Sequence, residues 1–106
     1  MSNKQRILRK NDQEVNKVTR TICVVFECEW EDVMSTSRET YLVNARMAFA
    51  EILYSELCLS QVNIARLLYV SQPAVSKLLK RHQDCLKYDS NYSQKYARLK
   101  ATWEYN

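Results

Sequence analysis

The sequence predicts an all-α protein, a compact bundle of five to six helices, on three observations. Gly is absent and Pro occurs once among the 106 residues, so the tight turns on which β hairpins depend are hard to form. Apolar residues recur every three or four positions over most of the chain, which is the period of an amphipathic helix. Serines precede several of these stretches, where a hydroxyl can accept a hydrogen bond from the first turn of a helix.

The composition limits the chain to one small folded domain. Hydrophobic residues make up 46% of the chain and charged residues 26%, which is enough apolar material for a core and too much for a disordered segment. The longest apolar runs have four or five residues, far fewer than a membrane span requires, and the N-terminus has no apolar signal core. We therefore expect a cytoplasmic protein without a membrane partner.

The residue types argue against enzymatic chemistry. Without Gly the chain cannot contain a Walker loop, a nucleophile elbow or a dinucleotide fingerprint, and His82 is the only histidine. The spacing of Cys23, Cys28, Cys58 and Cys85 matches no zinc template, so these residues are interpreted as reduced thiols packed as small hydrophobes. A metal site on His82 and Cys85 is the weaker alternative. We expect no catalytic residue, no cofactor, no metal and no small-molecule substrate.

Charge is distributed unevenly along the chain, whose formal net charge is +4. Residues 1–10 carry four basic groups and no acid, residues 11–70 carry five basic and nine acidic groups, and residues 71–106 carry seven basic and three acidic groups. Positive ends suggest a polyanion partner on one side of the molecule, although a solvated basic surface gives the same count. We divide the chain into a basic arm, residues 1–10, which either follows phosphates or is a frayed end, and a helical domain, residues 11–106.

The first helix is expected to begin at Asn11, with Glu14 completing a capping box, and to end near Cys28. An acidic stretch follows at residues 27–32, and it is interpreted as a short turn or one turn of helix with a solvated face. The apolar positions of the first helix are Val15, Val18, Ile22, Val25 and Phe26.

The next long helix is expected to begin after Ser37, which is a favourable N-cap. Ala45 and Ala48 are small, so another helix can approach this one closely. Its expected buried stripe is Tyr41, Ala45, Ala48, Phe49, Ile52 and Leu53.

Residues 59–82 carry the most specific pattern in the chain. Ser60 is expected to cap one short helix and Ser71 a second, whose first turn holds Pro73, where a missing N–H does no harm. Two helices this short cannot bury their apolar faces alone, so they must cross and share a core, which is the helix-turn-helix arrangement. Their expected apolar positions are Val62, Ile64, Ala65, Leu67, Leu68, Val75, Leu78 and Leu79.

The last helix is expected to begin at the N-cap Ser90 and to carry aromatic residues on one side. This side could also supply the contact of a homodimer, an arrangement that regulators use to span two half-sites. The residues on that side are Tyr92, Tyr96, Leu99 and Trp103.

The second helix of the motif has a surface suited to duplex DNA. A recognition helix enters the major groove with its N-terminus inward, so its exposed positions should be short and polar at first and basic further along. Gln72 can pair with an adenine edge and Ala74 can contact a thymine methyl. The expected DNA-binding residues of the two helices are Gln61, Asn63, Ser71, Gln72, Pro73, Ala74, Ser76, Lys77, Lys80 and Arg81.

The turn between these helices departs from the usual pattern at one position. Such motifs usually place a Gly in the left-handed conformation where this chain has Tyr69. We therefore expect a longer or differently shaped turn.

The flanking residues resemble those of a known family. Ser37–Arg38 followed by Asn-Ala-Arg-Met-Ala-Phe-Ala at residues 44–50 is similar to the C-terminal DNA-binding domain of DnaA-type bacterial replication initiators. The resemblance extends over roughly residues 11–103 and implies a tryptophan-repressor-like fold that binds duplex DNA. It also implies that Arg38 enters the minor groove and that Arg46 lies near the phosphates.

The chain departs from that family in its recognition signature. The family's Gly-Gly-Arg-Asp-His-Ser/Thr-Thr-Val is replaced by Tyr-Val-Ser-Gln-Pro-Ala-Val-Ser at residues 69–76, so the initiator's own target sequence is not implied. The leading hypothesis is a sequence-specific double-stranded DNA-binding protein of bacterial or mobile-element origin, acting as a stand-alone regulator of transcription or replication. The alternative is a protein-interaction module that kept the helical scaffold without DNA binding.

Overall fold

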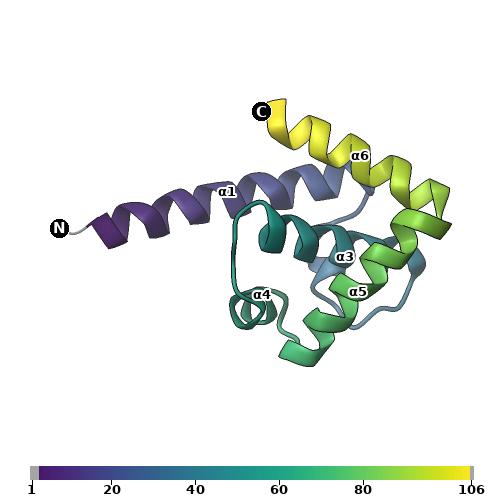
Figure 1. Cartoon of the computed structure of the whole chain (residues 1–106), viewed down its shortest axis with the longest axis horizontal. Helices are drawn as coiled ribbons and strands as arrows, with labels where there is room; N and C mark the ends of the chain where they lie inside the picture. Colours follow the sequence, from purple (N-terminus) through teal and green to yellow (C-terminus); the bar gives the residue numbers. More distant parts are fainter. Residues whose placement is uncertain (1–2, 106) are drawn as a thin grey trace.

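This computed structural model describes the backbone of residues 3–105 and the side chains of residues 12–104. The described part of the chain forms six helices joined by short segments (Figure 1). No strand occurs there, so the predicted all-α class with five to six helices is confirmed. None of these helices is both long enough and apolar enough to cross a bilayer. The helices are α1 (Asn3–Val25), α2 (Trp30–Val33), α3 (Thr40–Ser55), α4 (Gln61–Leu68), α5 (Gln72–Tyr88) and α6 (Ser90–Tyr105).

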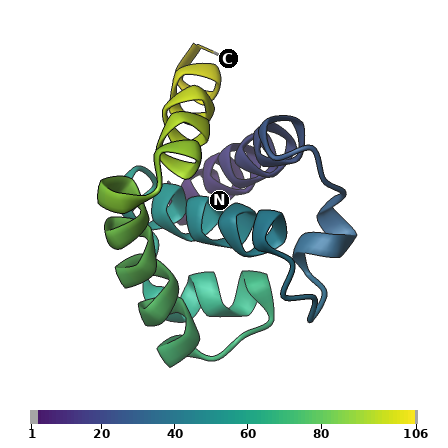
Figure 2. The same ribbon diagram turned by 90° about the vertical axis from the view of Figure 1, so that its right-hand side faces the viewer.

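Helix α3 is the centre of the fold. It contacts α1, α2, α4 and α5, and Figure 2 shows it surrounded by the other helices. Almost every residue from Leu42 to Leu53 is buried, and the small Ala45 and Ala48 are fully buried, as expected for close helix contacts. Each fully buried Leu, Ile or Phe contributes about 1.5–3 kcal/mol to folding. The largest fully buried side chains of the core include Ile22, Phe26, Met47, Phe49, Ile52, Leu53, Ile64, Tyr92 and Leu99.

Helix α1 is longer at its start than the sequence suggested. It begins at Asn3, eight residues before Asn11, because residues 4–10 are good helix formers without a breaker. The predicted basic arm, residues 1–10, is therefore helical in its described backbone, and its side chains lie outside the described residues. The helix ends at Val25 rather than near Cys28.

Two helix starts lie one or two residues away from the predicted serine caps. The N-cap of α3 is Glu39, while Ser37 Oγ accepts a hydrogen bond from the Glu39 N–H at 3.4 Å in the preceding turn. At α6 the Asp89 carboxylate, not Ser90, accepts from the Tyr92 N–H at 3.1 Å. An ionised carboxylate at the N-cap makes a stronger hydrogen bond than a hydroxyl, which explains the second difference.

Three side chains of the predicted apolar helix faces are exposed. Tyr41 of α3 is 37% exposed, and its neighbour Leu42 takes the buried position. In α4, Val62 and Leu67 are 43% and 39% exposed, because a helix of eight residues has only one narrow face against α3 and α5. The buried residues of α4 are Ile64, Ala65 and Leu68, as predicted.

Candidate nucleic-acid interface

Helices α4 and α5 contact each other and α3, and both begin at the predicted serines. Ser60 Oγ accepts a hydrogen bond from the Asn63 N–H, and Ser71 Oγ accepts one from the Ala74 N–H, each at 3.2 Å. A capping side chain of this kind contributes about 1 kcal/mol. The two serines therefore set where each helix starts and, with it, which side chains of its first turn face outward. Only α4, with 8 residues, is short as predicted, because α5 continues to Tyr88 and has 17 residues.

The turn between α4 and α5 has the backbone shape in which Gly is usual, although its residue is Tyr69. Tyr69 is left-handed, with φ 55° and ψ 44°, and its N–H donates to the Arg66 carbonyl at 3.4 Å. The Val70 N–H donates to the Ala65 carbonyl at 3.0 Å, which completes the Schellman pattern of a helix C-terminus. The prediction of a longer or differently shaped turn was wrong, because the tyrosine itself adopts the left-handed conformation.

In the first three helical turns of α5, the polar and basic side chains face outward. Buried Val75 and the partly buried Leu78 and Leu79 hold the other side of the helix on the core. Within residues 12–104 no side chain covers the outward side, and only Ala74 among the predicted contact residues of α5 is half-buried. The exposed residues there are Ser71, Gln72, Pro73, Ser76, Lys77, Lys80 and Arg81.

This surface is positive. No acidic residue occurs between Glu56 and Asp84, whereas four basic residues do. No acidic side chain within residues 12–104 forms an ion pair, at 4.0 Å or less, with any of the four. The exposed acids of residues 27–32 lie around α2, which Figure 2 shows across α3 from α5. The four basic residues are Arg66, Lys77, Lys80 and Arg81.

Arg38 is exposed in the segment between α2 and α3. Figure 2 shows this segment beside α2, across α3 from α5. Both views place it in the lower half of the molecule, and the turn before α5 lies in that half as well (Figures 1 and 2).

Arg46 lies half-buried in α3, and its guanidinium is bound to the backbone of the chain. Burial lowers its pKa from the usual value. Four of its five N–H groups are used in this way, so the geometry gives Arg46 a structural role in holding the segment that carries Arg38. We leave it out of the proposed DNA contacts. The acceptors are the carbonyls of Asp32 (3.3 Å), Val33 (2.7 Å), Ser35 (2.8 Å) and Ser37 (2.7 Å).

The predicted contacts from α4 are less favourably placed than those from α5. Gln61 is half-buried, whereas Asn63 is exposed and lines a shallow groove of about 480 Å³ between α4 and α1. Arg66 lines the same groove and was not among the predicted contacts. The signal that pointed to Arg66 is the absence of acids between residues 57 and 83, although the groove that Arg66 lines also holds the acidic Asp12 of α1.

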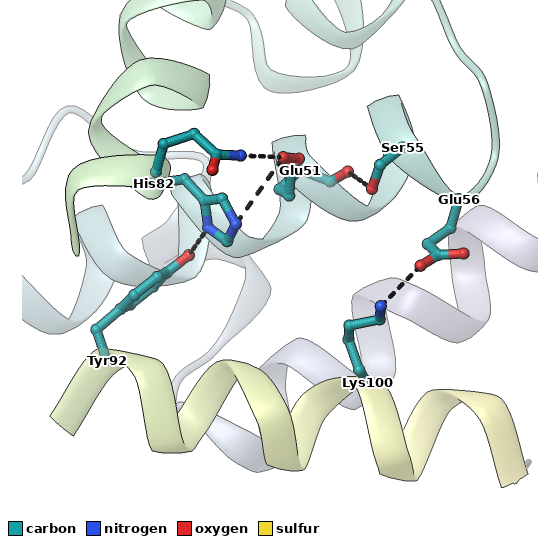
Figure 3. A network of polar contacts seen from close by, with 7 residues as sticks. Glu51, Ser55, Glu56, His82, Tyr92 and Lys100 are labelled. Carbon is teal, nitrogen blue, oxygen red and sulfur yellow. Dashed lines mark hydrogen bonds and ion pairs between the residues drawn. The ribbon is translucent and has the colours of Figure 1, made fainter. Parts of the chain in front are cut away.

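A buried polar network behind α5 was not predicted. His82 is 1% exposed, its Nδ1 lies 2.7 Å from Tyr92 Oη of α6, and its Nε2 lies 3.9 Å from Glu51 Oε1 of α3 (Figure 3). Gln83 Nε2 donates to the same Glu51 oxygen at 3.3 Å, while Oε2 has no hydrogen-bond partner within the described residues. The helical spacing from Val75 to His82, seven residues along the buried side of α5, was the signal available in the sequence.

Burial sets the protonation of this network. It lowers the pKa of His82 to about 4 and raises the pKa values of Glu51 and Tyr92. A neutral imidazole has one donor and one acceptor, and the Glu51 oxygen nearest to Nε2 is an acceptor. We therefore assign the proton to Nε2, which leaves Nδ1 to accept from the Tyr92 hydroxyl. The network links α3, α5 and α6 and holds α5 in place from behind.

Acidification should destabilise the fold through His82. Its pKa is about 4 in the folded protein and about 6.5 when unfolded, so this stability is complete above pH 6.5 and is lost as the pH falls towards 4. At about 1.4 kcal/mol per pH unit, less an offset from the raised pKa of Glu51, we expect a loss of about 2 kcal/mol between pH 7 and 4.5. Urea denaturation at the two pH values measures it. The variant His82→Gln should respond less to pH, and an equal response in both proteins would contradict the assignment.

The cysteines and histidine do not gather into a metal site. Cys23, Cys28 and Cys85 are partly buried, whereas Cys58 is exposed and so is not packed as predicted. Burial raises the pKa of Cys28 to about 11, which keeps its thiol protonated. Within the described residues, no three His, Cys, Asp or Glu side chains lie where they could hold one ion.

The outward side of α5 and the segment that carries Arg38 therefore form the candidate interface. No protein-family model, curated protein or solved structure matches the chain.

Proposed function

We propose that the chain binds double-stranded DNA sequence-specifically, with α4 and α5 acting as a helix-turn-helix, and that it serves as a stand-alone regulator of transcription or replication. The observation that carries this proposal is the outward side of α5, which is polar at the N-terminus, basic further along and free of acids until Asp84. The order of these side chains matches what a recognition helix needs as it enters a major groove.

In this proposal the first turn of α5 reads bases. Gln72 offers the paired donor and acceptor that match N6 and N7 of adenine, and Ala74 offers a methyl group to thymine. The hydroxyl of Ser76, on the next turn, can donate to a phosphate or a base edge. The positive end of the helix dipole lies at the same N-terminus and favours nearby phosphates.

The basic side chains supply affinity without reading sequence. Lys77, Lys80 and Arg81 would neutralise phosphates beside the groove and release their counterions. Arg38 would contact the duplex from the neighbouring segment, in the minor groove if the resemblance to the initiator family extends to this residue. The same resemblance supports a tryptophan-repressor-like arrangement of the helices.

Salt dependence and two substitutions test the proposal together. The logarithm of the affinity for duplex DNA should fall linearly with the logarithm of salt concentration. Lys77→Ala should weaken binding to all sequences and reduce the slope by about 1, whereas Gln72→Ala should cost about 1–3 kcal/mol and relax the preference at one base pair only. A titration with duplexes selected from a random pool measures both, and a palindromic selected motif would indicate a dimer.

Lys87→Ala is the matched control, because this exposed lysine lies in the last turn of α5, about 15 Å along the helix from Lys77. It should leave the slope unchanged. An affinity independent of salt would contradict the proposal. A chain that retains no duplex DNA would instead favour the protein-interaction module, with docking through residues 27–32 or α6.

A further inference from the structure

Three residues of the described chain have a left-handed backbone, and none is Gly, since the chain has none. They are Glu27, Cys58 and Tyr69, with φ of 53°, 57° and 55°, and each follows the end of a helix. Glu27 ends α1 in the same way as Tyr69 ends α4, because the Cys28 N–H donates to the Cys23 carbonyl at 3.1 Å. A left-handed backbone alone therefore does not distinguish Tyr69.

The side chain does distinguish it. A bulky aromatic residue is poorly suited to the left-handed region, and aromatic rings normally gain stability by burying large areas. The ring of Tyr69 is 84% exposed and takes no part in the hydrophobic core. Tyr88 is equally exposed, but it has an ordinary helical backbone at the end of α5. Glu27 and Cys58 are also exposed, but Tyr69 is the one aromatic residue of the described chain that combines a left-handed backbone with a side chain outside the core.

The position of Tyr69 indicates what the side chain contacts. It stands two residues before Ser71, so its Cα lies within about 7 Å of the N-cap of α5. Figure 2 shows this turn at the lower end, beside the first turn of α5. The surrounding stretch, residues 57–83, contains no acid, so the sequence neighbours of Tyr69 do not repel a phosphate.

We propose that Tyr69 is a DNA-backbone contact, whose hydroxyl donates a hydrogen bond to a phosphate oxygen at the edge of the groove that α5 enters. The inference rests on the proposed function and adds a residue to its binding site. A neutral hydroxyl releases no counterion and reads no base. Tyr69 therefore contributes equally to the affinity for every sequence and leaves the salt dependence unchanged, in contrast to the lysines of α5.

Two substitutions of Tyr69 separate its side chain from its backbone. Tyr69→Phe should bind all duplexes about three- to tenfold more weakly, with the same salt slope and the same melting temperature. Tyr69→Gly should lose as much affinity but melt about 4–8 °C higher, because Gly adopts the left-handed conformation without strain. Glu27→Gly, at the matching position of α1, should show the same rise in melting temperature with affinity unchanged within twofold.

The outcomes distinguish this inference from the proposed function. If the unmodified chain does not bind duplex DNA, both are overturned. If it binds and Tyr69→Phe binds as tightly, the contact is overturned while the proposed function stands. If Tyr69→Gly binds DNA more weakly but Tyr69→Phe does not, the proposed hydrogen bond is also overturned, because the affinity then does not depend on the hydroxyl. A weaker Tyr69→Phe whose salt slope falls would likewise contradict a neutral donor.

Discussion

Replacing His82 with leucine should lower the free energy of unfolding by about 3–4 kcal/mol. The substitution leaves the buried Tyr92 hydroxyl without a partner, and a buried unsatisfied polar group costs about 1–3 kcal/mol. The different shape of the leucine side chain adds about 1–3 kcal/mol of strain or lost contact in a close-packed site. Urea denaturation at pH 7, followed by far-ultraviolet circular dichroism, measures the change.

A matched control lies on the same helix. Tyr88→Leu alters an exposed residue of α5 and should change the free energy of unfolding by less than about 0.5 kcal/mol. If His82→Leu does not fold, Tyr92→Phe removes only the hydroxyl and should cost about 1–2 kcal/mol. A cost below about 1 kcal/mol for His82→Leu would show that the network does not hold α5 against α3 and α6.

Replacing Arg46 with lysine should cost about 2–4 kcal/mol, although the charge is kept. The planar guanidinium binds four backbone carbonyls at once, and an ammonium group has neither that geometry nor enough donors. The carbonyls that the ammonium group does not reach lose this donor, at about 1 kcal/mol each. Asp32 is the exception, because its carbonyl also accepts from the Ser35 N–H and hydroxyl. Thermal and urea denaturation measure the loss.

The same pair of measurements separates a structural role from a DNA contact at Arg46. If Arg46 instead contacted a phosphate from a solvent-exposed position, Arg46→Lys would keep most of the affinity for DNA and would leave the free energy of unfolding unchanged. Arg38→Lys is the control in the exposed segment, and its stability should change by less than about 0.5 kcal/mol. If Arg46→Lys and the unmodified chain have equal free energies of unfolding, the structural role is contradicted and Arg46 becomes a candidate DNA contact again.

Most of the candidate interface could be predicted, because its determinants are local in sequence. Ser60 and Ser71 cap helices through backbone N–H groups only three residues away. The spacing of Val75, Leu78 and Leu79 determines which side of α5 faces the core, and this leaves Gln72 and Lys77 outside. Neither step needs a distant part of the chain, so periodicity and capping chemistry were sufficient.

The errors arose where the outcome depends on a competing local interaction or a neighbouring helix. Tyr69 accepts the left-handed backbone because two hydrogen bonds of the turn require it. Asp89 displaces Ser90 as a cap because a carboxylate lies one residue earlier. Val62 and Tyr41 are exposed because no helix of the described chain covers the side on which they lie, although their spacing is that of buried residues.

The sequence by itself determined the all-α class, the two serine caps and the outward chemistry of α5, since each depends on residues within one or two helical turns. Only the tertiary structure decided that Arg46 binds the backbone of α2 and of the segment after it, and that His82, Glu51 and Tyr92 meet behind α5. These contacts join residues 9 to 31 positions apart on different elements. Helical periodicity says which side of a helix a residue occupies, but it does not say which other helix lies against that side.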